Sequence, residues 1–231
     1  MLSSGERNEW VWDHQCSVAN EGEKLIATED HPRESAHFGS AFDIVAIAAS
    51  AGGLKALSEV LSALPGNFPA TIAVVQHLDP RHRSLMADIL SRCTPLKVKQ
   101  AEEGDLVHPA TTYIAPPNRH LLVNPDGTLS LSQSELVHFV RPSADLLFES
   151  VAASFKDRAI AVVLTGTGSD GSMGVRAIKK MGGTVIVQDE KSSEFFGMPG
   201  AAMQTGAVDF VLPLADIPNA LISLVTKEEV G

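Results

Sequence analysis

Short apolar segments that alternate with amphipathic ones are the feature that most restricts the fold of this chain. Four of them, residues 42–48, 70–76, 160–165 and 184–188, read FDIVAIA, ATIAVVQ, IAVVLT and TVIVQ. Runs of this length are typical of strands that are buried on both faces of a parallel sheet. Parallel neighbours need crossover helices, and helical periodicity separates the runs. The alternation predicts an α/β fold, a doubly wound three-layer α/β/α sandwich with a mainly parallel sheet.

The remaining elements follow from the same patterns. Leu85, Ile89 and Cys93 recur at helical spacing, with Met86 and Leu90 beside them, which predicts a helix at about 81–92. The other expected elements are a helix beginning near Leu54, strands in 96–101 and 111–117, an inserted antiparallel hairpin in 120–132 turning at Pro125-Asp126-Gly127, a helix within 141–155, a helix at 172–181, a loop holding Met198 and Pro199, a short helix, a strand in 208–212 and a closing helix near 215–225.

Residues 1–40 differ from the rest of the chain in charge and in pattern. They hold eight acidic and three basic residues and show neither steady helical nor strand periodicity. We expect an acidic, mobile N-terminal extension at 1–40 and one domain at 41–231. Trp10 and Trp12 leave open the alternative that the extension is a peptide that docks on this domain or on a partner.

Composition and charge argue against several classes of protein. The net charge is −10, and nucleic-acid binding needs a basic face to attract phosphates, so no nucleic-acid partner is expected. No apolar stretch approaches the roughly 18–20 residues that span a bilayer, so direct membrane insertion is not expected either. The first residues lack the basic and apolar regions of a signal peptide, and Cys16 and Cys93 do not indicate a disulfide framework. We therefore expect a cytoplasmic protein.

Three polar side chains follow apolar segments at the edge where open parallel sheets bind their ligands. Ser50 lies in the turn ASAGG, whose small residues allow a sharp turn with an exposed hydroxyl, as in a nucleophile elbow. His77 and Asp170 follow two other segments. Each residue alone also fits a structural role, as a helix cap or a hydrogen-bonded histidine. Together they predict a nucleophile Ser50, a general base His77 and an orienting carboxylate Asp170.

The glycine-rich turn after the third segment has a competing interpretation. Gly166-x-Gly168-x-x-Gly171, with Asp189 and Glu190 after the next strand, is close to a dinucleotide-binding fingerprint. In such a site the pyrophosphate lies at the helix N-terminus, near the place of Asp170. A like-charge contact at about 4 Å costs on the order of 4 kcal/mol at an effective dielectric constant near 20. We favour the interpretation that the glycines aim Asp170 at the other two turns, with a nucleotide-binding oxidoreductase as the alternative.

From about Asp43 to Val225 the chain resembles the CheB family, the protein-glutamate methylesterases of bacterial chemotaxis. Six motifs in order carry the resemblance: ASAGG, VVQHLDP, AEEGDLVHPATTYIAPPNRH, RPSADLLFESVA, LTGTGSDGSMG and FGMPGAAM. It implies a catalytic triad of Ser50, His77 and Asp170 and a methylated glutamate on the cytoplasmic helical region of a chemoreceptor as the substrate. Methanol would leave, and some relatives also deamidate receptor glutamines through the same intermediate. The resemblance implies neither a metal nor an organic cofactor.

The resemblance also places Ala51, Gly52, Thr167 and Met198 in the substrate and oxyanion environment. Ala51 and Thr167 depart from the pattern, because many members have threonine and methionine at these two positions. We expect the departures to alter the oxyanion geometry or the substrate fit rather than to remove activity. A non-catalytic scaffold that keeps the fold is the alternative.

Typical members of the family begin with a phosphorylatable receiver domain that covers the active site until it is phosphorylated. The 40 residues before the predicted domain are too few for a receiver, which needs more than about 100. We therefore expect a chain that lacks the N-terminal receiver domain. Its activity would be constitutive or controlled by a separate regulatory protein or by residues 1–40.

Other polar residues near the predicted site have less specific interpretations. Arg81, His82 and Arg83 are either a solvated helix start or a patch that docks acidic receptor helices. His108, His120 and His138 lack metal-ligand spacing and are expected to have structural roles. Arg141 is expected to tie loops together.

Overall fold

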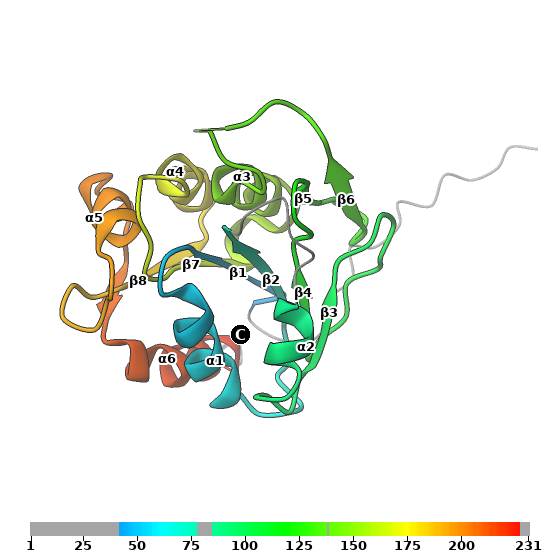
Figure 1. Ribbon diagram of the computed structural model, residues 1–231, viewed down its shortest axis with the longest axis horizontal. Helices are drawn as coiled ribbons and strands as arrows, with labels where there is room; N and C mark the ends of the chain where they lie inside the picture. Colours follow the sequence, from blue (N-terminus) through cyan, green and yellow to red (C-terminus); the bar gives the residue numbers. More distant parts are fainter. Residues whose placement is uncertain (1–41, 78–84, 138, 227–231) are drawn as a thin grey trace, which may run out of the picture. The chain divides into compact units, whose positions relative to one another are not determined.

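The computed structural model describes residues 42–77, 85–137 and 139–226, and a seven-stranded sheet runs through them (Figure 1). The extension at 1–40 lies outside the described residues. Every pairing in this sheet is parallel, which confirms the predicted sheet. The strands, in spatial order, are β3 (Lys97–Gln100), β4 (Thr111–Ile114), β2 (Thr71–Gln76), β1 (Ile44–Ala49), β7 (Ala159–Val163), β8 (Thr184–Gln188) and β9 (Phe210–Leu212).

Helices cover both faces of the sheet, as the doubly wound fold requires (Figure 1). The order of the strands reverses between β1 and β7, because the chain first extends the sheet through β2 and later through β8. A reversal of this kind opens a crevice at the carboxyl ends of the two central strands. One face carries α3 (Ala144–Phe155), α4 (Ser172–Lys180) and α5 (Gly197–Gln204), and the other carries α1 (Gly53–Ser62), α2 (Met86–Leu90) and α6 (Ile217–Val225). Two short 3-10 turns are also present: η1 (Lys156–Arg158) follows α3, and η2 (Leu214–Asp216) precedes α6.

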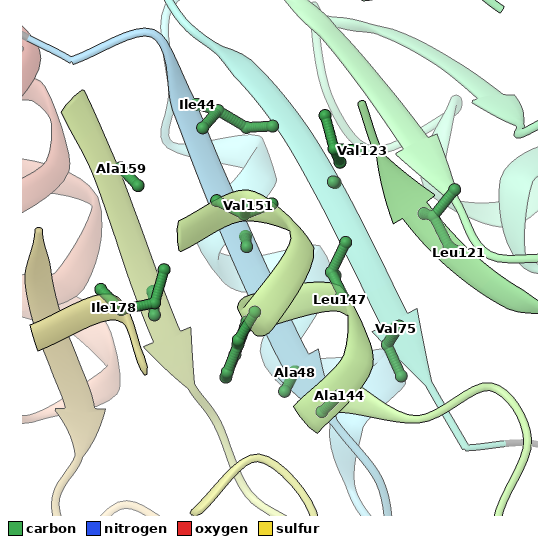
Figure 2. Close-up of a cluster of buried hydrophobic side chains, with 14 of the residues drawn as sticks. Ile44, Ala48, Val75, Leu121, Val123, Ala144, Leu147, Val151, Ala159 and Ile178 are labelled. Atoms are coloured by element: carbon green, nitrogen blue, oxygen red, sulfur yellow. The ribbon is translucent and has the colours of Figure 1, made fainter. Parts of the chain in front are cut away.

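The predicted hairpin is present as β5 (His120–Val123) and β6 (Leu129–Ser132), a separate two-stranded antiparallel sheet. Its turn includes Gly127 at φ +79°, a conformation that glycine adopts without a side-chain clash. Leu121 and Val123 point from β5 toward α3, where they join the same apolar cluster as Leu147 (Figure 2). This packing fixes the start of β5 beside the start of α3.

Two local predictions differ from the structure. The helix expected at 81–92 is confirmed only as α2, and residues 81–84 lie outside the described residues. Met86 and Leu90 are buried, whereas Leu85 and Ile89 are exposed, because the contacts of α2 with α1 and β3 select one of two apolar sides. The loop expected to hold Met198 and Pro199 is wrong at these residues, because both lie in the first turn of α5 and are buried.

The contact between α3 and α4 gives a stability prediction. Phe148 is fully buried, and a Cβ on Gly174 would lie 2.5 Å from the Phe148 Cβ, so the two helices are in close contact. Phe148→Ala is expected to lower the free energy of unfolding by about 3–5 kcal/mol, because it removes buried apolar surface and leaves a cavity. Urea denaturation measures this loss. Phe139→Ala is the control, since Phe139 is 95% exposed; equal losses in the two variants would contradict the assigned core.

Candidate active site

Ser50 and His77 follow directly on two strands that are paired in register. Ala49 of β1 pairs with Gln76 of β2, and the His77 amide donates to the Ala49 carbonyl at 3.1 Å. Neighbouring strands lie about 4.8 Å apart, so the two residues begin at adjacent positions on the carboxyl edge of the sheet. The Gln76 side-chain amide donates to the Ser50 carbonyl at 2.6 Å and to the His77 carbonyl at 3.1 Å. Gln76 thereby ties the two turns together.

The Ser50 turn requires the glycines that follow it. Gly52 has φ +76°, in the left-handed region that disfavours other residues. A Cβ on Gly53 would lie 2.0 Å from the Gln76 Oε1, so any larger residue there would displace the side chain that ties the turns. The turn is also held from the segment that follows β7, because the Ser50 amide donates to the Thr165 carbonyl at 3.0 Å.

Asp170 contacts His77 directly. The distance from the His77 Nε2 to the Asp170 Oδ2 is 2.8 Å, and Asp170 is only 4% exposed. A neutral His77 that donates its Nε2 proton to Asp170 has Nδ1 as its basic nitrogen. The two nitrogens have the opposite roles in the Ser-His-Asp proteases, where the carboxylate binds Nδ1. The structure therefore brings together two of the three predicted triad residues in a direct hydrogen bond.

Asp170 is also bound by the beginning of α3. It accepts hydrogen bonds from the Ser143 hydroxyl at 2.8 Å, from the Ala144 amide at 2.6 Å and from the Asp145 amide at 3.1 Å. The positive end of the α3 dipole therefore faces a carboxylate. Burial acts to raise the pKa of Asp170, but these donors and His77 outweigh it and hold the pKa below the usual range. Asp170 is thus kept ionised and fixed in orientation.

The start of α4 answers the question raised by the glycine-rich turn. Gly171 precedes α4 at φ +96°, and the amides of Met173 and Gly174 in its first turn donate to the Asp145 Oδ1 at 2.9 and 2.8 Å. A dinucleotide would need such amides for its pyrophosphate. Here a buried carboxylate already occupies them. The arrangement favours the interpretation that the glycines let the loop bend so that Asp170 points toward the turns of Ser50 and His77.

The four residues assigned to the substrate and oxyanion environment lie near Ser50 to different degrees. Ala51 and Gly52 belong to its turn, and the Ala51 carbonyl accepts the Thr165 hydroxyl at 3.1 Å. Met198 is buried, and its amide donates to the Gly166 carbonyl at 2.9 Å. Thr167 is exposed in the loop between β7 and α4. Their roles in oxyanion binding stay a prediction.

A cavity of about 470 Å³ opens beside Ser50, between α1 and α2. Its walls are largely apolar, with the exposed Leu54 from α1 and the exposed Ile89 and buried Met86 from α2. An open, apolar recess suits an uncharged aliphatic group next to a nucleophile. Ser50, Gly52, Gly53, Lys55, Ser58 and Gln76 complete the lining.

The remaining candidates have other outcomes. Arg81, His82, Arg83 and His138 lie outside the described residues, and His108 is exposed. Arg141 does tie loops together, because its guanidinium donates to the Asn118 side chain and to the carbonyls of Gln133 and Ser134. In the described ranges, no group of three His, Cys, Asp or Glu side chains is placed to hold a metal ion.

Three residues that contribute to the site were not assigned to it from the sequence. Gln76 ends an apolar segment and looks like an ordinary strand residue. Ser143 precedes an apolar helical run, a pattern that indicates only a helix cap. His120 was assigned a structural role. In the structure it is fully buried, and its Nδ1 accepts a hydrogen bond from the Ser143 amide. Only the tertiary contacts connect these residues with the three predicted triad residues.

Gly166 allows the close approach of the loop after β7 to Ser50, and this gives a second prediction. A Cβ at Gly166 would lie 2.8 Å from the Ser50 Cβ and 3.1 Å from its backbone nitrogen. Gly166→Ala is expected to lower the kcat of any reaction at Ser50 by about 10–100-fold, because displacement of a reacting group by about 1 Å costs up to that much. Steady-state kinetics test it. Gly66→Ala is the control, since its Cβ would come no nearer than 3.4 Å to Pro95; a Gly166→Ala variant as active as this control would contradict the prediction.

The comparisons with known proteins agree with this geometry. The CheB methylesterase family matches residues 45–221. The chain is 43% identical over 188 residues to the protein-glutamate methylesterase/protein-glutamine glutaminase of Moorella thermoacetica, covering 80% of this chain and 44% of that protein. It is 46% identical over 184 residues to the protein-glutamate methylesterase FrzG of Myxococcus xanthus, covering 80% of this chain and 55% of the relative. The chain thus spans about half the length of these two relatives.

A solved structure is also similar. The crystal structure of the CheB methylesterase catalytic domain of Thermotoga maritima is 41% identical, with a TM-score of 0.77, and covers 80% of this chain and 99% of that chain. The described part of the chain has no helix both long and apolar enough to cross a membrane. Because the family match extends over most of the chain and agrees with the fold and with the placement of the three turns, this protein belongs to the CheB methylesterase family.

Proposed function

We propose that this protein is a serine hydrolase that demethylates glutamate methyl esters on chemoreceptors. The observation that carries the proposal is the 2.8 Å contact between the His77 Nε2 and an ionised, buried Asp170. His77 directly follows β2, the strand next to the one that ends just before Ser50. A hydroxyl is a weak nucleophile unless a base removes its proton. Ser50 and His77 follow the paired ends of β1 and β2, which supports the assignment of His77 as that base.

The chemistry proceeds in two acyl transfers. The Ser50 oxygen attacks the ester carbonyl while the His77 Nδ1 takes the hydroxyl proton, and Asp170 stabilises the imidazolium through Nε2. The tetrahedral intermediate expels methoxide, which takes the proton from His77 and leaves as methanol. Water then attacks the acyl-serine with His77 as the base. Ser50 is released, and the product is a glutamate carboxylate.

The substrate class follows from the relatives and is consistent with the site. The Moorella relative is named for both a methylesterase and a glutaminase activity. A glutamine amide would pass through the same acyl-serine, with ammonia in place of methanol as the leaving group. The largely apolar recess beside Ser50 is consistent with an uncharged ester side chain as the substrate. Because the modified glutamates lie on the cytoplasmic helical region of the receptor, we infer a cytoplasmic location for this protein.

Methanol release tests the proposal. The purified protein is incubated with radiomethyl-labelled receptor from its own organism, and volatile methanol is counted for wild type and for Ser50→Ala. A serine-reactive phosphonate is applied in parallel, and the labelled residue is identified by mass spectrometry. Release and labelling that both depend on Ser50 support the proposal. A protein that releases no methanol and does not label at Ser50 would be a non-catalytic member of the family.

A further inference from the structure

His120 lies at the start of β5 and is fully buried, and both of its ring nitrogens are used. The Nε2 group donates to the Glu135 carbonyl at 3.0 Å, and Nδ1 accepts the Ser143 amide proton at 3.1 Å. A ring that donates at one nitrogen and accepts at the other is neutral. Burial favours the same state, because it lowers the pKa of His120. His120 is therefore neutral, and it connects the Glu135 carbonyl with the Ser143 amide at the beginning of α3.

The residue bound by the His120 Nδ1 is Ser143, which directly precedes α3. Ser143 is completely buried and is the N-cap of that helix. Its hydroxyl donates to the Asp170 Oδ1, and the next two amides, those of Ala144 and Asp145, donate to the same carboxylate. Of the four hydrogen bonds that the described residues make with Asp170, three therefore come from the Ser143 turn, whose first amide is fixed by His120. The fourth is the bond to His77.

We propose that His120 is a positioning residue for the triad, and that it acts on Asp170 through the Ser143 turn. The proposal rests on the function proposed above. Without an acceptor at the His120 Nδ1, the buried Ser143 amide would lose its partner, and an unsatisfied buried amide drives the backbone to move. The Ser143 hydroxyl and the following amides would move with it. The carboxylate would then turn away from the His77 Nε2.

Two substitutions of His120 separate this role from a purely structural one. The side-chain oxygen of His120→Asn lies near the place of Nδ1, so it keeps the acceptor for the Ser143 amide and loses the bond to Glu135. The amide nitrogen of His120→Gln reaches the place of Nε2, so it keeps the bond to Glu135 and loses the acceptor. Each variant is neutral and loses one hydrogen bond. A structural role alone would therefore weaken both variants to a similar extent.

Kinetics and NMR give the two readouts. We expect kcat for ester hydrolysis to fall by about 10–100-fold in His120→Gln, with KM within about twofold of wild type, because only the alignment of the reacting groups is lost. His120→Asn should keep kcat within about threefold. The Nε2 proton of His77, which is shared with Asp170, should give the same downfield NMR signal in wild type and His120→Asn and a shifted or broadened signal in His120→Gln.

Ser143→Ala provides a second variant, since it removes the hydroxyl and leaves the backbone amide in place. It should lower kcat by about tenfold and shift the same His77 signal. Equal kcat values in the two His120 variants, an effect confined to KM, or an unchanged signal in both His120→Gln and Ser143→Ala would overturn the proposal. The NMR signal does not require turnover, so the two proposals can fail separately. If neither the wild-type protein nor any variant hydrolysed the ester, the proposed function would be refuted, and a shifted His77 signal in His120→Gln would still support the positioning role.

Discussion

Ser50→Ala is expected to lower kcat for methanol release by roughly 10⁶-fold, the loss that follows removal of the nucleophile from a comparable triad. The fold should be unaffected, because Ser50 contributes a small, half-buried side chain and its backbone bonds to Thr165 and Gln76 remain. Steady-state kinetics on labelled receptor and thermal unfolding measure the two quantities. The expected result is an inactive protein that melts at the wild-type temperature.

Another serine of α1 provides a matched control for this experiment. Ser62 is exposed and does not line the recess, and its hydroxyl donates to the Glu59 carbonyl at 3.0 Å. Ser62→Ala should keep kcat within about twofold of wild type, since exposed substitutions of this kind change little. If Ser50→Ala retained more than about 1% of the wild-type rate, another nucleophile would have to be sought.

Asp170→Asn is expected to lower kcat by about 10⁴-fold, the effect of the same change in a serine protease triad. An amide at this position cannot accept from both oxygen positions, and its NH₂ group would face the donors at Ala144 and His77. The buried donors that lose their acceptor should also cost about 1–3 kcal/mol of folding free energy. Kinetics and urea denaturation, each measured between pH 3 and pH 8, test both parts.

The stability contributed by Asp170 should change with pH in one direction. The folded-state pKa of Asp170 lies below its ordinary value of 3.8, so its ionisation stabilises the fold above that value. The contribution disappears as the pH falls through the lower, folded-state pKa. Asp170→Asn lacks this carboxylate and should therefore lose less stability on acidification than wild type does. A variant with the same acid dependence as wild type would contradict the assigned environment.

Asp209→Asn is the control for Asp170→Asn. Asp209 also accepts a backbone amide and a charged side chain, from Val185 and Lys179, but Val185 lies near the amino end of β8 and so at the other edge of the sheet. The substitution should lower stability modestly and leave kcat unchanged. Comparable losses of kcat in the two variants would mean that the effect at Asp170 is not one of catalysis.

The strands and the three turns could be predicted from the sequence because each is a local pattern. A run such as IVAIA has few alternatives once helical periodicity follows it, and a polar residue directly after the run must lie at the carboxyl edge. The charge of Asp170 was enough to weigh against the dinucleotide interpretation, because one carboxylate changes which ligand a helix N-terminus attracts. These inferences use residues that are close together in the sequence.

The side chains that hold the site could not be predicted in this way. His120 and Ser143 are 23 positions apart, and Ser143 and Asp170 are 27 apart, so their hydrogen bonds form only after the hairpin and α4 pack on α3. Which side of α2 is exposed could not be predicted for the same reason. Apolar residues lie on both sides of this helix, and only tertiary packing selects the side that is buried. Met198 was expected in a loop, and its neighbours Gly197, Pro199 and Gly200 are poor helix formers, so local propensity does not indicate the first turn of α5.

The exchange of hydrogen bonds between α3 and α4 has a consequence for folding. Asp170, just before α4, accepts the first amides of α3, and Asp145, at the start of α3, accepts the first amides of α4. The half of the site with Asp170 is therefore held mainly by contacts within residues 143–174, to which His120 adds one bond from the hairpin, while β1, α1 and β2 form the half with Ser50. The bond between His77 and Asp170 spans 93 positions and joins the halves. Because distant contacts form late, refolding chains should regain their helices before they regain catalytic competence.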